Sequence, residues 1–196
     1  MGSAGHEIRA ACRTLAAGAD GADDQAPGLP GGRGRVASAG VTPREIALAD
    51  DLRALAALDA PSYTYACELA APGADRHSAE AWARAVFEDA PAALRRLIVT
   101  GWIAGLGLRL APRGSPEHVL GWTILTNEPR VIVLAVGSPI LAARIVVRAR
   151  AGDVVHATLV RYERSLARPL WLVAAPIHAR VIPHLLGRAG ARLAAT

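Results

Sequence analysis

The sequence predicts an α+β domain in which a curved antiparallel sheet wraps around a long C-terminal helix, with two helices inserted after the first strand. The closing apolar segment carries Pro169, Pro176 and Pro183 at seven-residue spacing, which at about 100° per residue puts them on one helix face. Proline removes a backbone hydrogen bond, so this helix should bend away from that face. Several short β-type segments precede it. We expect its apolar, concave side to comprise Leu166, Leu170, Val173, Ile177, Val181 and Leu185.

The N-terminal 42 residues are rich in Gly, Ala, Asp and Pro, and we expect residues 1–42 to form a disordered tail. We interpret the Gly-Arg cluster at 28–35 as a linker rather than as an RNA-binding tail. Translation from a start codon at Val36 or Val41 is a second explanation for this segment, because coding sequence upstream of the true start would lack folding signals.

Residues 43–61 are expected to form a short helical lead-in, and residues 62–190 the main domain. Thr42 suits the N-cap of a helix and Pro43 its first position, so the lead-in helix should begin there and end near Leu58. Pro61 would stop it.

The main domain begins with alternating aromatic and small residues at 62–69, which predict the first strand. Two helices follow. Ser78 suits the N-cap of the first helix, whose inner face carries Trp82 and Val86. The second helix should run from 92 to about 106. Four more strands are then expected, at 119–126, 131–136, 140–150 and 154–163, before Ser165 caps the final helix.

Composition restricts the location and partners of the protein. All 22 basic residues are Arg and the formal net charge is +5. We attribute this to codon usage in a GC-rich genome, so the isoelectric point of 10.2 is discounted as a sign of function. Cys12 and Cys67 form no disulfide framework, and the N-terminus does not match a secretory signal. We therefore expect a cytoplasmic protein.

An uncharged segment at 97–108 is too short to cross a bilayer, so we expect no transmembrane segment. A core helix is favoured there over a segment lying on a membrane surface. Arg residues are frequent after residue 140. Arg144, Arg148 and Arg150 lie on the same face of one predicted strand, and we expect that face to be exposed to solvent. The same strands lack exposed-looking aromatic residues for base stacking, which argues against a nucleic-acid partner.

Three groups of residues, taken in order, carry a family resemblance: Trp82-Ala83-Arg84; Leu106-Gly107-Leu108-Arg109-Leu110 followed by Gly121-Trp122; and Val160-Arg161-Tyr162 leading to Pro176-Ile177-His178. Together they resemble an uncharacterised bacterial family of the helix-grip superfamily, whose relatives include START domains, polyketide cyclases and Bet v 1-like proteins. The resemblance spans about 62–188. It implies a sheet that grips the C-terminal helix, with a ligand cavity between them, and it supplies no catalytic residues. Some members of the family accompany nucleotide-binding reductase domains.

Strand parity predicts which side chains face that cavity. In the last strand Arg161 and Glu163 should face outward, which turns His156, Thr158, Val160 and Tyr162 inward. Burial of unpaired polar groups is costly, so His, Thr and Tyr on an inner face indicate a ligand pocket or internally satisfied core groups. Both interpretations remain open at this stage.

Three further aromatic side chains are candidates for the pocket wall. Trp122 alternates with apolar neighbours on its strand, and Trp171 and His178 lie seven residues apart on the final helix. The alternative for each is ordinary core packing. His178 and His184 lack the four-residue spacing of a helical metal pair, so no metal site is expected, nor is any cofactor. No nucleophile motif accompanies the Ser residues.

These observations favour a protein that binds a hydrophobic or amphipathic small molecule between sheet and C-terminal helix. We expect binding rather than catalysis; a reaction of the cyclase or dehydratase kind would have His156, Tyr162 or His178 as proton carriers. The alternative is a non-enzymatic interaction module that docks an anionic partner or a reductase through its Arg-rich sheet face.

Overall fold

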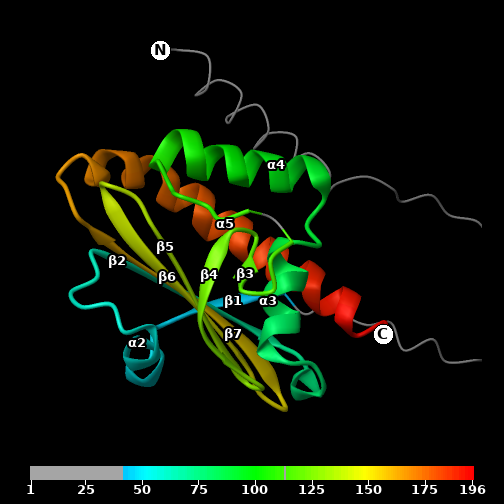
Figure 1. The fold of residues 1–196 in the computed structure, drawn as a ribbon. Helices are drawn as coiled ribbons and strands as arrows, with labels where there is room; N and C mark the ends of the chain where they lie inside the picture. Colours follow the sequence, from blue (N-terminus) through cyan, green and yellow to red (C-terminus); the bar gives the residue numbers. More distant parts are fainter. Residues whose placement is uncertain (1–41, 113) are drawn as a thin grey trace, which may run out of the picture. The chain divides into compact units, whose positions relative to one another are not determined.

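The computed structural model describes residues 42–112 and 114–196, so the predicted tail lies outside the described residues except for Thr42. The described chain has the predicted α+β, helix-grip-like architecture: a long C-terminal helix packs against an open antiparallel sheet of seven strands in the order β1-β2-β7-β6-β5-β4-β3 (Figure 1). The strands are β1 (Arg44–Ile46), β2 (Tyr63–Ala70), β3 (His118–Val119), β4 (Trp122–Glu128), β5 (Val131–Gly137), β6 (Leu141–Ala149) and β7 (Asp153–Tyr162). The helices are α2 (Asp50–Ala56), α3 (Ala79–Phe87), α4 (Ala92–Thr100) and α5 (Ala167–Leu193), with the short turns η1 (Ala74–Arg76) and η2 (Gly101–Gly105).

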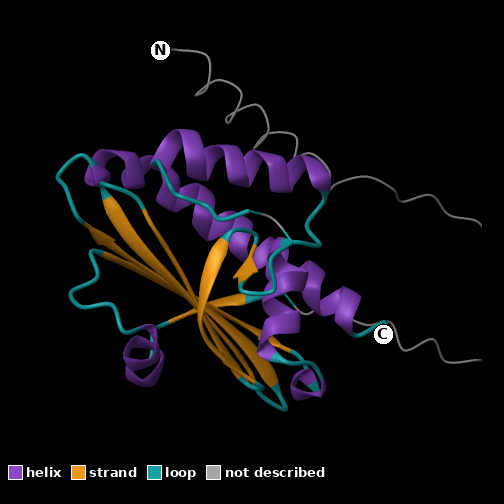
Figure 2. Cartoon of the chain, viewed as in Figure 1, coloured by secondary structure: helices purple, strands orange, loops and turns teal. Residues whose placement is uncertain are grey.

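The helices inserted after β2 follow the predicted start signals. Ser78 accepts a hydrogen bond from the Ala81 amide at 3.1 Å, so it caps α3 as expected, and Trp82 and Val86 are buried. The second helix is α4, which passes into the π-helical turn η2 before the chain leaves the helical conformation at Leu106. Figure 2 shows α3 beside α5 on one side of the twisted sheet, with α4 along the top of the view.

Three local predictions are wrong. Residues 44–46 form β1 on the edge of β2 rather than the first turn of a helix, because Arg44 pairs with Glu68 across the two strands, and α2 begins only at Asp50. The strand predicted to end at residue 126 continues to Glu128 and begins at Trp122. The cap position of α5 is Leu166, and no side chain caps it, so Ser165 does not have its predicted role.

The main core lies on one face of the sheet, called the inner face below. α3 covers β4, β5 and β6 there, and α5 covers β2 and β7. The predicted parity of β6 is confirmed, since its alternate side chains all belong to this core: Leu141, Ala143, Ile145, Val147 and Ala149. In β7 the same rule places Val154, His156, Thr158 and Val160 on the inner side, where all are buried.

The opposite, outer face is not the open Arg-rich surface that the sequence suggested. α2 packs over it and builds a second small core with Leu52, Val146 and Leu159. Arg148 forms an ion pair with Asp51 of α2 and is largely covered. On the same face Arg150 pairs with Asp153 at 2.9 Å, and Arg161 pairs with Glu163 at 2.7 Å.

The long helix α5 contains Pro176 and Pro183 in its interior, with Pro169 in its first turn. Its buried side chains are Ala167, Trp171, Ile182, Leu185, Leu186 and Ala189. At about 100° per residue these lie opposite the three prolines, as the predicted geometry requires. The predicted apolar stripe, however, lies about a quarter turn away. Leu166 and Val173 are therefore exposed, at 58% and 67%.

Composition alone would also allow α5 to cross a membrane. Its most apolar window has a mean hydropathy of 1.3, which is weak support, because the core helix of a soluble protein passes the same test. Leu185 and Leu186 in its C-terminal half are fully packed into the main core. The absence of a transmembrane segment therefore stays a prediction.

Candidate functional site

A chain of polar side chains joins α5 to the inner face of the sheet. Nε2 of His178 lies 3.1 Å from the Thr158 hydroxyl oxygen, and its Nδ1 lies 3.5 Å from the hydroxyl oxygen of Tyr63. A neutral imidazole has one donor and one acceptor nitrogen. The arrangement fits a ring protonated at Nε2, which donates to Thr158 while Tyr63 donates weakly to Nδ1.

His156 lies next to these polar side chains, on β7. Unlike them, it has no hydrogen-bond partner on another described residue. Its side chain is fully buried, and within the described residues neither Nδ1 nor Nε2 forms a hydrogen bond to another residue, its one polar contact being with its own backbone. The indole nitrogens of Trp122 and Trp171 are also buried and unpaired. Nearly all buried polar groups in proteins find a partner, so four unpaired ring nitrogens on one side of a sheet require an explanation.

Aromatic rings surround the two imidazoles in two groups. Around His178 stand Tyr63, Tyr65 and Trp171, with ring centres 5.3 to 6.0 Å from it. The ring of Phe87 lies 6.0 Å from His156, and Trp102 links Phe87 to Trp122 at centroid distances of 6.1 and 5.4 Å. The groups form a mostly apolar lining with a few polar atoms, which is typical of ligand sites.

The predicted candidates do not all come together. His178 contacts Thr158 and Trp171 directly, and Trp122 and His156 join through Phe87 and Trp102. Tyr162 is different. It ends β7 and packs only partly buried against the main core, and its backbone amide donates to the Ser62 hydroxyl at 3.1 Å. We therefore leave Tyr162 outside the candidate site.

Sequence reasoning did not assign Tyr63, Tyr65, Phe87 and Trp102 to the site. The signal for the two tyrosines is their parity, since Tyr63, Tyr65 and Cys67 occupy alternate positions of one strand. That parity becomes informative only with the β2–β7 register, which sets Tyr65 opposite Thr158 and Cys67 opposite His156. The register joins residues about ninety positions apart in the chain.

Burial determines the charge state of the site. It lowers the pKa of His156 to about 3, with a smaller contribution from the neighbouring His178 imidazole, and it lowers the pKa of His178 to about 4. Burial also raises the pKa of Tyr63 to about 12 and that of Tyr65 further. At neutral pH the site thus holds uncharged donors and acceptors, which suit a neutral polar group.

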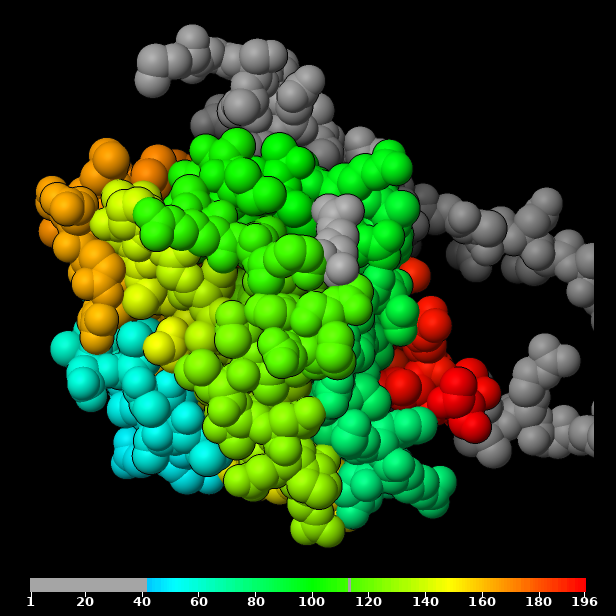
Figure 3. Space-filling model, viewed as in Figure 1, coloured from blue at the N-terminus to red at the C-terminus, as the bar shows by residue number. Residues whose placement is uncertain are grey.

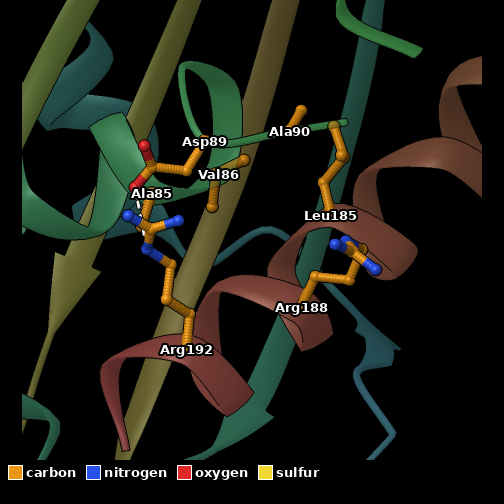
Figure 4. Close-up of a pocket in the computed structure, with 7 residues that line it drawn as sticks. All are labelled: Ala85, Val86, Asp89, Ala90, Leu185, Arg188 and Arg192. Carbon is orange, nitrogen blue, oxygen red and sulfur yellow. Dashed lines mark ion pairs between the residues drawn. The ribbon is translucent and has the colours of Figure 1, made fainter. Parts of the chain in front are cut away.

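The two hollows found among the described residues do not lie at this site. A hollow of about 50 Å³ lies elsewhere, between the end of α3 and the C-terminal part of α5, where Arg192 reaches across to Asp89 at 3.2 Å (Figure 4). A second, shallow hollow of about 480 Å³ lies on the surface along α2. Neither is lined by His156, Thr158 or His178. The candidate site is closed in this conformation.

The donor set of the site has two imidazoles and hydroxyls but no carboxylate or thiolate cluster. Within the described residues no group of three His, Cys, Asp or Glu side chains is arranged to hold a metal ion. Hydrogen bonding to a buried neutral ligand is the chemistry that these side chains offer. Comparison of the chain with family models, with curated proteins and with solved structures gives no match.

Proposed function

We propose that this protein binds a small, largely apolar molecule carrying one or two polar groups, between the inner face of its sheet and α5. The observation that supports this proposal is the fully buried His156, whose two ring nitrogens have no partner on any other described residue. Leaving a buried donor or acceptor unpaired costs about 1–3 kcal/mol. A ligand hydroxyl or carbonyl at this position would remove that cost.

The surroundings support the same ligand chemistry. The indole N–H groups of Trp122 and Trp171 are two more buried donors that a ligand oxygen can satisfy. The nearby rings of Phe87 and Trp102 offer apolar contact area to its hydrocarbon part. The resemblance to the helix-grip superfamily, which we also propose as the ancestry of this chain, implies a ligand in this same space.

Entry requires α5 to move, because the site is closed. The N-terminal half of α5 is the less firmly held half: Ala167 and Trp171 are its buried residues, whereas Leu172 is 69% exposed. Pro176 also interrupts the helix hydrogen bonding there. Displacement of this half would open the aromatic lining while Leu185 and Leu186 keep the C-terminal half in place.

The rival function, docking through the Arg-rich sheet face, has less support. Arg148, Arg150 and Arg161 each have a carboxylate partner, and α2 covers part of that face. Their charges are thus largely neutralised locally. Arg144 has no ion pair within the described residues, but it is half-buried and donates to the Ala143 carbonyl. We therefore place this function second.

Native mass spectrometry of the full chain, purified from the organism that encodes it, tests the proposal. We expect one bound molecule per chain, released on denaturation and identified by chromatography of the extract. Trp171→Phe removes one N–H while keeping an aromatic ring, and should weaken retention; His184→Gln, on the exposed side of α5, is the matched control.

A bare mass would contradict the proposal if His156→Phe at the same time increased the free energy of unfolding. That combination would mean that His156 is an unsatisfied core residue and not part of a site. His156→Gln provides a milder variant if His156→Phe does not fold, because it keeps polar atoms at the position.

A further inference from the structure

Exposed apolar side chains gather at one end of the described molecule. Among residues 42–112 and 114–196, six large apolar side chains are exposed, and four of them lie on η2 or at the beginning of α5. These four are Ile103, Leu166, Leu172 and Val173, with exposures of 52%, 58%, 69% and 67%. We call them the apolar tip. The other two, Leu55 and Leu125, lie on α2 and β4.

The β5–β6 turn brings η2 and the start of α5 to the same end. After η2, the Arg109 amide donates to the Gly137 carbonyl at 3.0 Å. Before α5, the amides of Glu163 and Arg164 both donate to the Ile140 carbonyl. One short turn thus supports both segments. In Figures 1 and 3 the α4–η2 segment (green) and the start of α5 (orange) lie at the same upper-left end.

The two segments that carry the apolar tip hold charges of one sign, and the nearest acidic residue before α5, Glu163, is paired with Arg161. Residues 92–112 and 164–196 contain eight Arg and none of the 17 acidic residues of the chain. Codon usage explains Arg in place of Lys, but it does not explain the absence of Asp and Glu from these two segments. Arg168 and Arg180 are exposed on α5, and neither has an ion pair within the described residues. By contrast Arg44, Arg84 and Arg150 all pair with carboxylates.

Exposed apolar residues on the same helix as Arg168 and Arg180, which have no ion pair within the described residues, favour one kind of partner. Apolar side chains enter the boundary of a bilayer, while Arg attracts anionic headgroups. A second copy of the same chain would bring the same positive charges into contact, which is unfavourable. We propose that the apolar tip docks the protein on the surface of an anionic membrane, with α5 lying along the surface rather than crossing it.

Vesicle sedimentation of the full chain tests this proposal independently of any ligand in the candidate site. We expect binding to phosphatidylcholine vesicles containing phosphatidylglycerol, and about tenfold weaker binding to phosphatidylcholine alone or at high salt. Leu172→Ser with Val173→Ser, and separately Arg168→Glu with Arg180→Glu, should each reduce binding about tenfold. Leu125→Ser and Arg53→Glu, exposed elsewhere, are the matched controls and should leave it unchanged.

A fluorescent label distinguishes a membrane from other occupants of the apolar tip. In a Cys12→Ser background, bimane is attached to Val173→Cys. Its emission should be that of a water-exposed label in buffer, and that of a label in apolar surroundings after anionic vesicles are added. A label already in apolar surroundings in buffer, or a dimer that Leu172→Ser with Val173→Ser dissociates, would overturn the proposal. Equal binding of the control and tip variants to vesicles would overturn it as well.

Discussion

The hydroxyl group of Tyr65 donates a hydrogen bond to the carbonyl oxygen of Ala179, 3.3 Å away, across the interface between the sheet and α5. In an uninterrupted helix this oxygen would accept from the amide four residues later, but that residue is Pro183, which has no N–H. The proline therefore frees an acceptor, and a tyrosine of the sheet uses it. A sequence feature that weakens an isolated helix thus ties this helix to β2.

This relationship predicts that the contribution of Tyr65 depends on Pro183. Tyr65→Phe should lower the free energy of unfolding by about 1 kcal/mol, because the Ala179 carbonyl loses its partner. In a Pro183→Ala background the new amide can bond that carbonyl, so the same substitution should cost close to nothing. Urea denaturation of the four proteins measures the difference.

Pro176→Ala is the matched control for this cycle. The carbonyl that Pro176 frees belongs to Leu172, which is 69% exposed and can bond water. Tyr65→Phe should therefore keep its full cost in that background. An equal cost in all three backgrounds would mean that Tyr65 stabilises the protein through packing alone.

The imidazoles of the buried His156 and the half-buried His178 predict a loss of stability in mildly acidic solution. The folded-state pKa values of about 3 for His156 and about 4 for His178 lie below the usual 6.5, so between these limits the unfolded chain binds more protons. Stability should be complete above pH 6.5 and decrease as the pH falls towards 4, by up to about 1.4 kcal/mol per pH unit for each imidazole.

Urea denaturation between pH 5 and 7 checks this slope, in a range above the usual titration of carboxylates. His178→Gln should remove about half of the dependence, whereas His184→Gln should leave it unchanged, because His184 is exposed. A flat profile for the unsubstituted protein would show that both imidazoles are in contact with water in solution.

The parity of β7 could be predicted because Arg161 and Glu163 identify its outer face, and alternation then places His156 and Thr158 inside. Whether the outer face is exposed to solvent was harder to predict. Arg148 suggests solvent in a single strand, yet its partner Asp51 lies on a helix about a hundred residues earlier. Pairing of that kind depends on topology and leaves no local pattern.

The buried face of α5 could not be found from hydropathy. The face turned to the sheet includes the buried Ala167 and Trp171 and the half-buried, polar His178, while the more hydrophobic Leu172 and Val173 are exposed. The proline positions were the better guide, because the steric cost of proline directs it away from packing whatever its neighbours are. The tyrosines of the site required the β2–β7 register, which only the folded chain supplies.

Cys67 provides a third prediction, because its thiol is fully buried on the inner face opposite His156. Burial raises its pKa to about 12, and reaction requires the thiolate. In a Cys12→Ser variant, which leaves Cys67 as the one thiol, a disulfide reagent at pH 8 should react only at the rate of unfolding. Rapid reaction in the absence of denaturant would show that the inner face opens far more easily than this packing implies.

Two glycines in the last turns of α5 provide a fourth prediction, because substitution by alanine should change the free energy of unfolding in opposite directions at the two positions. A Cβ at Gly190 would lie 2.5 Å from Cδ2 of the buried Leu69 on β2, whereas at Gly187 its nearest neighbour would be Pro43 at 3.4 Å. Gly187→Ala should stabilise the protein by up to about 1 kcal/mol, because alanine favours helix. Gly190→Ala should destabilise it by about 1–3 kcal/mol through overpacking.

Leu69→Val tests the cause of that cost, because valine lacks the δ-carbon that the new methyl group would meet. The destabilisation caused by Gly190→Ala should be smaller in the Leu69→Val background than in the unsubstituted protein, as measured by a double-mutant cycle in urea. If Gly190→Ala stabilised the protein as much as Gly187→Ala, the close crossing of α5 over β2 would be contradicted. The C-terminal half of α5 would then not be the fixed end about which its other half moves to admit a ligand.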